Sequence, residues 1–209
     1  MDTIAPDHLI RDEATLEALY GEASAGAIAK EIDTIHPHYR TMIEASPFVV
    51  LATSGPGGLD CSPRGDPAGF VHVLDDKTLA IPDRRGNNRA DSLRNIIHDP
   101  RVALLFLIPG VGETLRVNGT AVISIDPALL ERFPYRGTLP RSAIVVTADR
   151  VYFQCPKALV RSELWNPEKQ ISRKSLPSTG TILADITAGK VGGEQYDRDY
   201  PDRLRTTLY

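Results

Sequence analysis

Two short segments of the sequence concentrate side chains that suit an anion. The first is Cys61-Ser62-Pro63-Arg64-Gly65-Asp66, and the second is Pro82-Asp83-Arg84-Arg85-Gly86-Asn87-Asn88-Arg89. Arginine offers planar, bidentate donors that match the oxygens of a phosphate group. The second segment lies where a predicted strand turns into a predicted helix, and a helix start supplies unpaired N–H groups and partial positive charge. The basic cluster between Arg64 and Arg89 therefore predicts a phosphate site.

A solvated surface turn is the alternative interpretation of these arginines, because runs of charge usually lie on the surface of a protein. The sequence lacks the phosphate-binding loops of other families, since it has neither GxxxxGK[ST] nor a GxGxxG after a strand. These motifs therefore cannot decide between the two interpretations. Gly86 would let the backbone approach a ligand closely. The arginines alone leave both interpretations open.

The composition requires any anion site to be local. The chain has 209 residues, of which 42% are apolar and 24% charged, which is typical of one globular domain with a substantial core. Its net charge of -3 gives no general attraction to nucleic acid or to an anionic membrane. We therefore expect neither of these as a partner.

Several other classes of site and location are disfavoured. Cys61 and Cys155 lie far apart without a CxxC spacing, which argues against a disulfide framework or a zinc site. His36 and His38 have no third ligand in view, so no metal site is expected. Neither a membrane-spanning run nor a signal-peptide core in residues 1–11 is found, which predicts a cytoplasmic protein.

The elements that would position the cluster are mainly strands. A helical pattern covers residues 12–45, and β-rich runs follow at 48–53, 70–74, 78–81, 101–108, 115–125 and 142–154. Short turns between these runs favour an antiparallel barrel over alternating strands and helices. The run 101–108 is almost entirely apolar, so we expect it to be buried on both faces.

Helices interrupt and follow the strands. One is predicted over 88–98 with Asn87 or Asn88 as its N-cap, one over 127–133, and one after Pro156. The tail from Asn166 is rich in polar residues, Gly and Pro, which indicates an arm on a partner subunit or partial disorder. We thus divide a single domain into an N-terminal helical segment (1–45), a barrel (46–165) and a C-terminal arm (166–209).

The order of these motifs resembles a known family. A helix, a strand at 48–53, SPRGD, a hairpin ending in IPDRRGNNR, a helix and a strand at 101–108 resemble the pyridoxamine 5′-phosphate oxidase-like family of FMN-binding split barrels. The Cys-Pro-Lys stretch at 155–157 and Trp165 are similar to its flavin-nucleotide-binding branch. This resemblance spans residues 35–170. It implies a mainly β fold with flanking helices, a six-stranded antiparallel split β-barrel, and a homodimer with FMN between the protomers.

The resemblance also implies roles for individual residues. Arg64 would contact the FMN phosphate, and the opening of the following helix would complete the phosphate grip. The end of the preceding strand would lie against the ring or ribityl chain through main-chain contacts. Lys157, Arg161 and Trp165 would lie near the flavin of the same or the opposing subunit. The implied cofactor-binding residues are Arg64, Ile81, Pro82, Asp83, Asn88, Arg89, Lys157, Arg161 and Trp165.

No nucleophile–base set or pair of carboxylates stands out, which fits a flavoprotein whose cofactor supplies the redox chemistry. The leading hypothesis is an FMN-dependent oxidoreductase acting on a small molecule or a nicotinamide donor, with no catalytic residue assigned. The alternatives are a non-catalytic flavin-binding or storage protein, or a split barrel that uses F420 or haem. Because no histidine follows Trp165, the vitamin B6 oxidase reaction itself is not expected.

Overall fold

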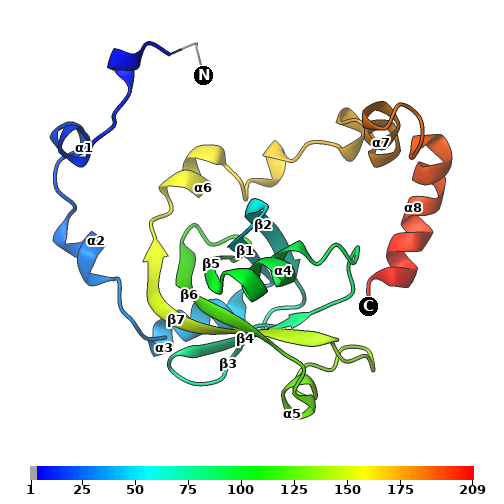
Figure 1. The fold of residues 1–209 in the computed structure, drawn as a ribbon, viewed down its shortest axis with the longest axis horizontal. Coiled ribbons are helices and arrows are strands. Elements are labelled where there is room, and N and C mark those ends of the chain that lie inside the picture. Colours follow the sequence, from blue (N-terminus) through cyan, green and yellow to red (C-terminus); the bar gives the residue numbers. More distant parts are fainter. Residues whose placement is uncertain (1–3) are drawn as a thin grey trace.

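One antiparallel sheet of seven strands forms the centre of the structure, a computed structural model that describes residues 4–209 (Figure 1). Its strands follow the order β2-β1-β5-β6-β7-β4-β3. They are β1 (Phe48–Gly55), β2 (Gly58–Gly65), β3 (His72–Val73), β4 (Thr78–Asp83), β5 (Arg101–Leu107), β6 (Thr114–Ser124) and β7 (Ser142–Gln154). The mainly β fold with flanking helices is confirmed, but the sheet has seven strands where six were expected.

Strand β2 is the one that the apolar pattern did not reveal. It pairs along its whole length with β1, from Gly58 opposite Gly55 to Gly65 opposite Phe48. Its side chains are exposed or half-buried throughout, so they show no apolar alternation. Because β2 is an edge strand, Pro63 can sit in it without removing a ladder hydrogen bond from the sheet interior.

The sheet is curved around a single core but is not closed. Its two edges, β2 and β3, are joined by no ladder in the described part of the chain. One face of the sheet supplies fully buried side chains such as Leu51, Leu104 and Ile144. Helix α3 (Pro37–Ala45) adds Ile43 to the same core, and α4 (Asp91–His98) adds Ile96. Burial of this apolar surface is the main force that holds the sheet in its curved form.

Strand β5 is buried on one face only, which corrects the expectation of burial on both. Val102, Leu104 and Phe106 point into the core, whereas the alternate residues are half-buried on the outer face. This outer face borders an open hollow of about 420 Å³ lined also by Val50 and Arg116. The outer face of β1, β5 and β6 is therefore a second, partly apolar surface of the sheet.

Strands β6 and β7 form the longest pair, and a β-bulge interrupts it. The register shifts between Asn118 and Gly119, which marks a β-bulge. Gly119 approaches β7 so closely that an added Cβ would lie 1.9 Å from the carbonyl oxygen of Thr147. Only glycine fits at this position, because any side chain would overlap the β7 backbone.

The predicted N-terminal helical segment forms three separate helices, α1 (Glu13–Tyr20), α2 (Ala25–Ala29) and α3, while its residues 1–3 lie outside the described part. His36 caps α3 by accepting from the backbone N–H of His38, and Pro37 occupies its first turn as predicted. Ser46 ends α3 and donates its hydroxyl to the carbonyls of Phe48 and Leu107. The helix is thereby fixed to β1 and β5.

The C-terminal tail after Asn166 forms helices as well as connecting segments. After α6 (Lys157–Ser162), it forms α7 (Thr179–Ile186) and α8 (Gly193–Thr207). These helices pack closely at Gly180, whose N–H donates to the Asp197 carboxylate at 2.7 Å. Tyr209 then returns to the sheet and donates its hydroxyl to Asp66 at 3.0 Å.

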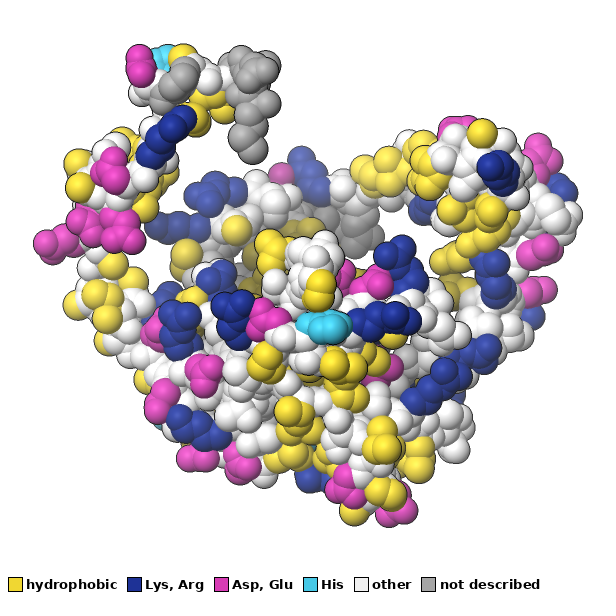
Figure 2. Space-filling model, viewed as in Figure 1, with side chains coloured by type: hydrophobic (Ala, Val, Ile, Leu, Met, Phe, Trp, Pro, Cys, Tyr) yellow, Lys and Arg dark blue, Asp and Glu magenta, His cyan; other side chains and the backbone are white. Residues whose placement is uncertain are grey.

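Helices α1 and α2 at one end of the described chain, and α7 and α8 near the other, project from the sheet, and Figure 2 shows apolar side chains on the surface of both projections. Leu19 and Ile28 are more than half exposed at the N-terminal end, as is Ile186 at the C-terminal end. Helix α5 (Pro127–Leu130) lies on the opposite side of the molecule (Figure 1). Within residues 4–209, no helix has both the length and the apolar character of a membrane span.

The bulge gives a first testable prediction. Gly119→Ala places a methyl group against the β7 backbone, and such overpacking should lower the free energy of unfolding by about 1–3 kcal/mol. Chemical denaturation measures this change. Gly57→Ala is the matched control, since nothing lies within 4 Å of an added Cβ there. Equal stability of the two variants would contradict the close packing at Gly119.

Candidate anion-binding site

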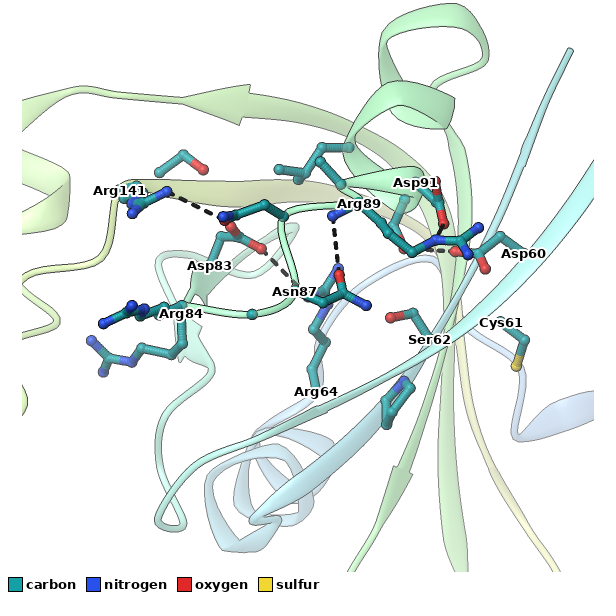
Figure 3. A pocket seen from close by; sticks show the side chains of 18 residues that line it. Asp60, Cys61, Ser62, Arg64, Asp83, Arg84, Asn87, Arg89, Asp91 and Arg141 are labelled. Carbon is teal, nitrogen blue, oxygen red and sulfur yellow. Dashed lines mark hydrogen bonds and ion pairs between the residues drawn. The ribbon is translucent and has the colours of Figure 1, made fainter. Parts of the chain in front are cut away.

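A cavity of about 550 Å³ lies where β2, the end of β4, the start of α4 and the start of β7 meet (Figure 3). The pairing of β4 with β7 sets Asp83 opposite Ser142 and brings the end of one strand to the start of the other. Four of the nine predicted cofactor-binding residues line this cavity, namely Arg64, Asp83, Asn88 and Arg89. The structure thus brings the two predicted segments to one place.

Arg64 contributes a buried donor that has no partner. Its Nη1 atom lies 3.4 Å from Oδ1 of Asp83. Its Nε atom is buried without a hydrogen-bond partner among the described residues. An unsatisfied buried donor costs about 1–3 kcal/mol, and more when it is charged. Arg64 lines the cavity together with four other arginines, so the residues present fit an anionic group.

Asp83 is the acidic neighbour of this donor. Burial raises the pKa of its carboxyl above the ordinary value of 3.8, while the nearby guanidinium groups of Arg64 and Arg141 act in the opposite direction. The net rise means that burial outweighs the attraction to the two arginines. A further negative charge in the cavity would repel the Asp83 carboxylate, so Asp83 is electrostatically coupled to any anion bound there.

Arg84 lines the cavity, but its guanidinium is engaged by partners that do not line it. Its Nε donates to Asp66 at 2.7 Å, and its Nη1 donates to the carbonyl of Phe133 at 2.9 Å. The Asp66 side chain is only 1% exposed. Figure 3 shows the Arg84 side chain directed away from Ser62 and Asp60 on the far side of the cavity. Arg84 is therefore engaged in a structural ion pair.

Arg89 lies at the rim of the cavity. Its Nε donates to Asp91 at 2.7 Å, and its side chain is 74% exposed. The ion pair holds the guanidinium at the opening of α4, but solvent screens it strongly. Its contribution to anion binding should therefore be smaller than that of Arg64, whose side chain is only 23% exposed.

The loop before α4 is held in an unusual backbone conformation. The predicted N-caps are wrong, because α4 begins at Asp91 after the left-handed residue Ala90, and no side chain caps it. Asn87 instead accepts a hydrogen bond from the backbone of Arg89 at 3.0 Å. Asn88 is also left-handed, with φ of 61°, and such strained residues concentrate at ligand sites.

The sequence did not identify Arg141, which lines the cavity from the segment before β7. Its Nη1 lies 3.5 Å from Oδ1 of Asn88. Arg141 stands more than fifty positions after the second basic segment, so only the β4–β7 pairing brings it there. The one feature of the sequence that could have indicated Arg141 is its position directly before the predicted strand that begins at Ser142.

The other predicted residues lie away from the cavity lining. The Ile81 side chain is fully buried in the core, and Pro82 is buried beside it. Lys157 and Arg161 belong to α6, and the Nε1 of Trp165 donates to the carbonyl of Val111 at 2.8 Å. Their contact with a flavin therefore remains a prediction.

Comparison with known proteins gives one family match and several similar solved structures. Residues 35–155 match the family model described as pyridoxamine 5′-phosphate oxidase. No curated protein matches the chain.

Among solved structures, HupZ of Group A Streptococcus is 19% identical with a TM-score of 0.46, over 56% of this chain and 91% of its own. General stress protein 26 of Bacillus anthracis is 21% identical with a TM-score of 0.38, over 54% and 88%. An FMN-binding protein of Syntrophomonas wolfei is 13% identical with a TM-score of 0.42, over 66% and 96%. The family model covers more than half of the sequence, and the chain accordingly belongs to the pyridoxamine 5′-phosphate oxidase family.

Proposed function

We propose that this protein binds FMN, with the flavin phosphate in the cavity between β2 and the start of α4. The observation that carries the proposal is Arg64, which lines this cavity and whose Nε has no hydrogen-bond partner among the described residues. Five arginines and three aspartates line the cavity, which leaves an excess of positive charge in a chain whose net charge is -3. Membership of the family favours a flavin over other phosphate esters.

Each residue near the phosphate has a distinct task in this proposal. Arg64 donates from a half-buried position beside Asp83, and Arg141 adds a second guanidinium from the segment before β7. Asn88 and Arg89 complete the grip at the opening of α4. Paired, charge-assisted donors of this kind bind phosphate oxygens more strongly than neutral donors do.

The remainder of the flavin would extend from the phosphate along the end of β4. The main chain of Ile81, Pro82 and Asp83 would contact the ring or ribityl chain, because two of these side chains are buried. Lys157, Arg161 and Trp165 would lie near the flavin of the same or the opposing subunit.

A homodimer is part of the same proposal. The outer face of β1, β5 and β6 is partly apolar and open, with Val50, Ala103 and Leu105 along its hollow. A second copy of the chain would cover this face and form two equivalent sites. Within each protomer, we propose one domain with residues 1–45 as an N-terminal segment and 166–209 as an arm. A cytoplasmic location completes the proposal.

A bound flavin would supply hydride transfer, so we propose an oxidoreductase acting on a small molecule with a nicotinamide donor. The chain's own residues bind the cofactor and orient it, and none is assigned as catalytic. The alternatives are flavin storage without turnover, or binding of F420 or haem in the same fold. The absorbance spectrum of the purified protein distinguishes these cofactors, and oxidation of reduced nicotinamide distinguishes catalysis from storage.

Removal of Arg64 tests the phosphate site. Arg64→Ala should weaken FMN binding by about 1.5–3 kcal/mol, the scale of a hydrogen bond to a charged group, or about tenfold to 150-fold in Kd. Riboflavin, which lacks the phosphate, should bind both proteins equally. Fluorescence titration measures each affinity, with Arg150→Ala on the exposed side of β7 as control. Wild-type FMN affinity in Arg64→Ala would exclude this site.

Asp83 gives a prediction on pH. Because the pKa of Asp83 is raised in the folded chain, the stability that the protonated carboxyl contributes is lost as pH rises from about 3.8 through the raised pKa. Asp83→Asn should therefore lose less stability over this range, which thermal denaturation at several pH values measures. It should also bind FMN more tightly at pH 7, because a repelling charge is removed.

Asp149→Asn, at an exposed position of β7, is the matched control for this change of charge. It should leave both the pH dependence of stability and the FMN affinity as in the wild type. Weaker FMN binding by Asp83→Asn would show instead that the Asp83 carboxylate is needed to hold Arg64 in place.

A further inference from the structure

A second cavity of about 220 Å³ adjoins the proposed phosphate site. The two cavities share four lining residues, which are Asp83, Arg84, Arg85 and Arg141. The far wall of the second cavity is formed by Leu139, Pro140 and Tyr209. A ligand that leaves the phosphate site toward β7 would therefore pass between arginines into a smaller space with apolar and aromatic walls.

Unpaired positive charge lies at the junction of the two cavities. Neither Arg85 nor Arg141 forms an ion pair with a carboxylate of residues 4–209. Arg84 is held by Asp66, and the shared Asp83 already faces Arg64. Arg85 has no task at the first phosphate, and Arg141 lines both cavities, so both guanidinium groups are placed for an anion beyond the first phosphate.

Tyr209 supplies a fixed aromatic surface on the far wall. Its hydroxyl donates to Asp66, and its ring lies 4.3 Å from the ring of Tyr135. The guanidinium of Arg136 packs over the Tyr209 ring at 5.7 Å. Burial and the hydrogen bond to Asp66 raise the pKa of Tyr209 to about 12, so the hydroxyl remains a donor at neutral pH. The ring is held from three sides and forms a preorganised wall.

We propose that this second cavity is a subsite for a second anionic group that carries a flat, mainly apolar body. Arg85 and Arg141 would bind the phosphoryl or carboxylate group, and the body would lie against Pro140 and Tyr209. The proposal rests on the proposed phosphate site, since the subsite begins where the flavin phosphate would end. Two sources have this chemistry: the adenylate half of FAD, continuous with the flavin phosphate, or a separate anionic ligand bound beside FMN.

Binding measurements with defined probes test the subsite and distinguish its two sources. The wild-type protein is titrated with riboflavin, FMN and FAD, and the FMN-saturated protein is titrated with AMP, whose phosphate carries a flat base. A continuous ligand predicts that FAD binds at least about tenfold more tightly than FMN. A separate ligand predicts that AMP binds the FMN-saturated protein without displacing the flavin.

Variants test whether the FAD preference or the AMP affinity arises in the second cavity. Tyr209→Ala and Arg85→Gln should each reduce the FAD preference or the AMP affinity by at least about tenfold. Tyr209→Ala should change FMN affinity less than it reduces the FAD preference or the AMP affinity, because Tyr209 lines the second cavity and not the first. Tyr209→Phe keeps the ring and should retain most of the signal, which separates loss of the wall from loss of the hydrogen bond to Asp66. Arg150→Gln on β7 is the control for loss of charge.

Each outcome decides the proposal. If FAD binds no more tightly than FMN and AMP does not bind, the subsite is excluded, although tighter binding of FMN than of riboflavin would still support the phosphate site. A full FAD preference or AMP affinity in Tyr209→Ala would also overturn the subsite. Equal affinity for FMN and riboflavin would overturn the proposed phosphate site and, with it, the subsite.

Discussion

The buried ion pair between Asp66 and Arg84 joins the two segments that carry the anion site. Asp66 follows β2 and Arg84 follows β4, so one contact at 2.7 Å connects two strands that are not neighbours in the sheet. The carbonyl of Phe133 and the hydroxyl of Tyr209 satisfy further polar groups of the pair. Breaking a buried pair by removal of one partner typically costs about 3–5 kcal/mol. The position of the loop beside Arg64 depends on this contact.

The same arrangement limits how strongly the cluster attracts anions in general. Two of the five arginines around the larger cavity are engaged with Asp66 and Asp91, and Arg64 faces Asp83. The excess positive charge is therefore small and confined to the cavity, which suits one bound phosphate better than an extended polyanion. An anion that enters must also compete with Asp83 for Arg64. Selectivity then depends on fit to the Arg64 guanidinium as much as on net charge.

The sequence predicts those features that depend on local pattern. Six of the seven strands were found from their β-rich runs, as was the helical pattern before them that includes α3. Strand β2 could not be predicted from the apolar pattern, because both its faces are accessible and its side chains therefore show no apolar alternation. Which arginine binds and which forms a structural pair could not be predicted, because the partners of Arg84 and the approach of Arg141 depend on contacts distant in the chain.

The C-terminal segment is attached to the body of the protein at two points. Trp165 donates to the carbonyl of Val111 where the segment begins, and Tyr209 donates to Asp66 where it returns. Between them, α7 and α8 pack mainly on each other. A segment tethered at both ends explores a small volume, so its apolar residues keep a high effective concentration near the sheet. Weak contacts made by this segment would thus act as intramolecular ones, with little further entropy to lose.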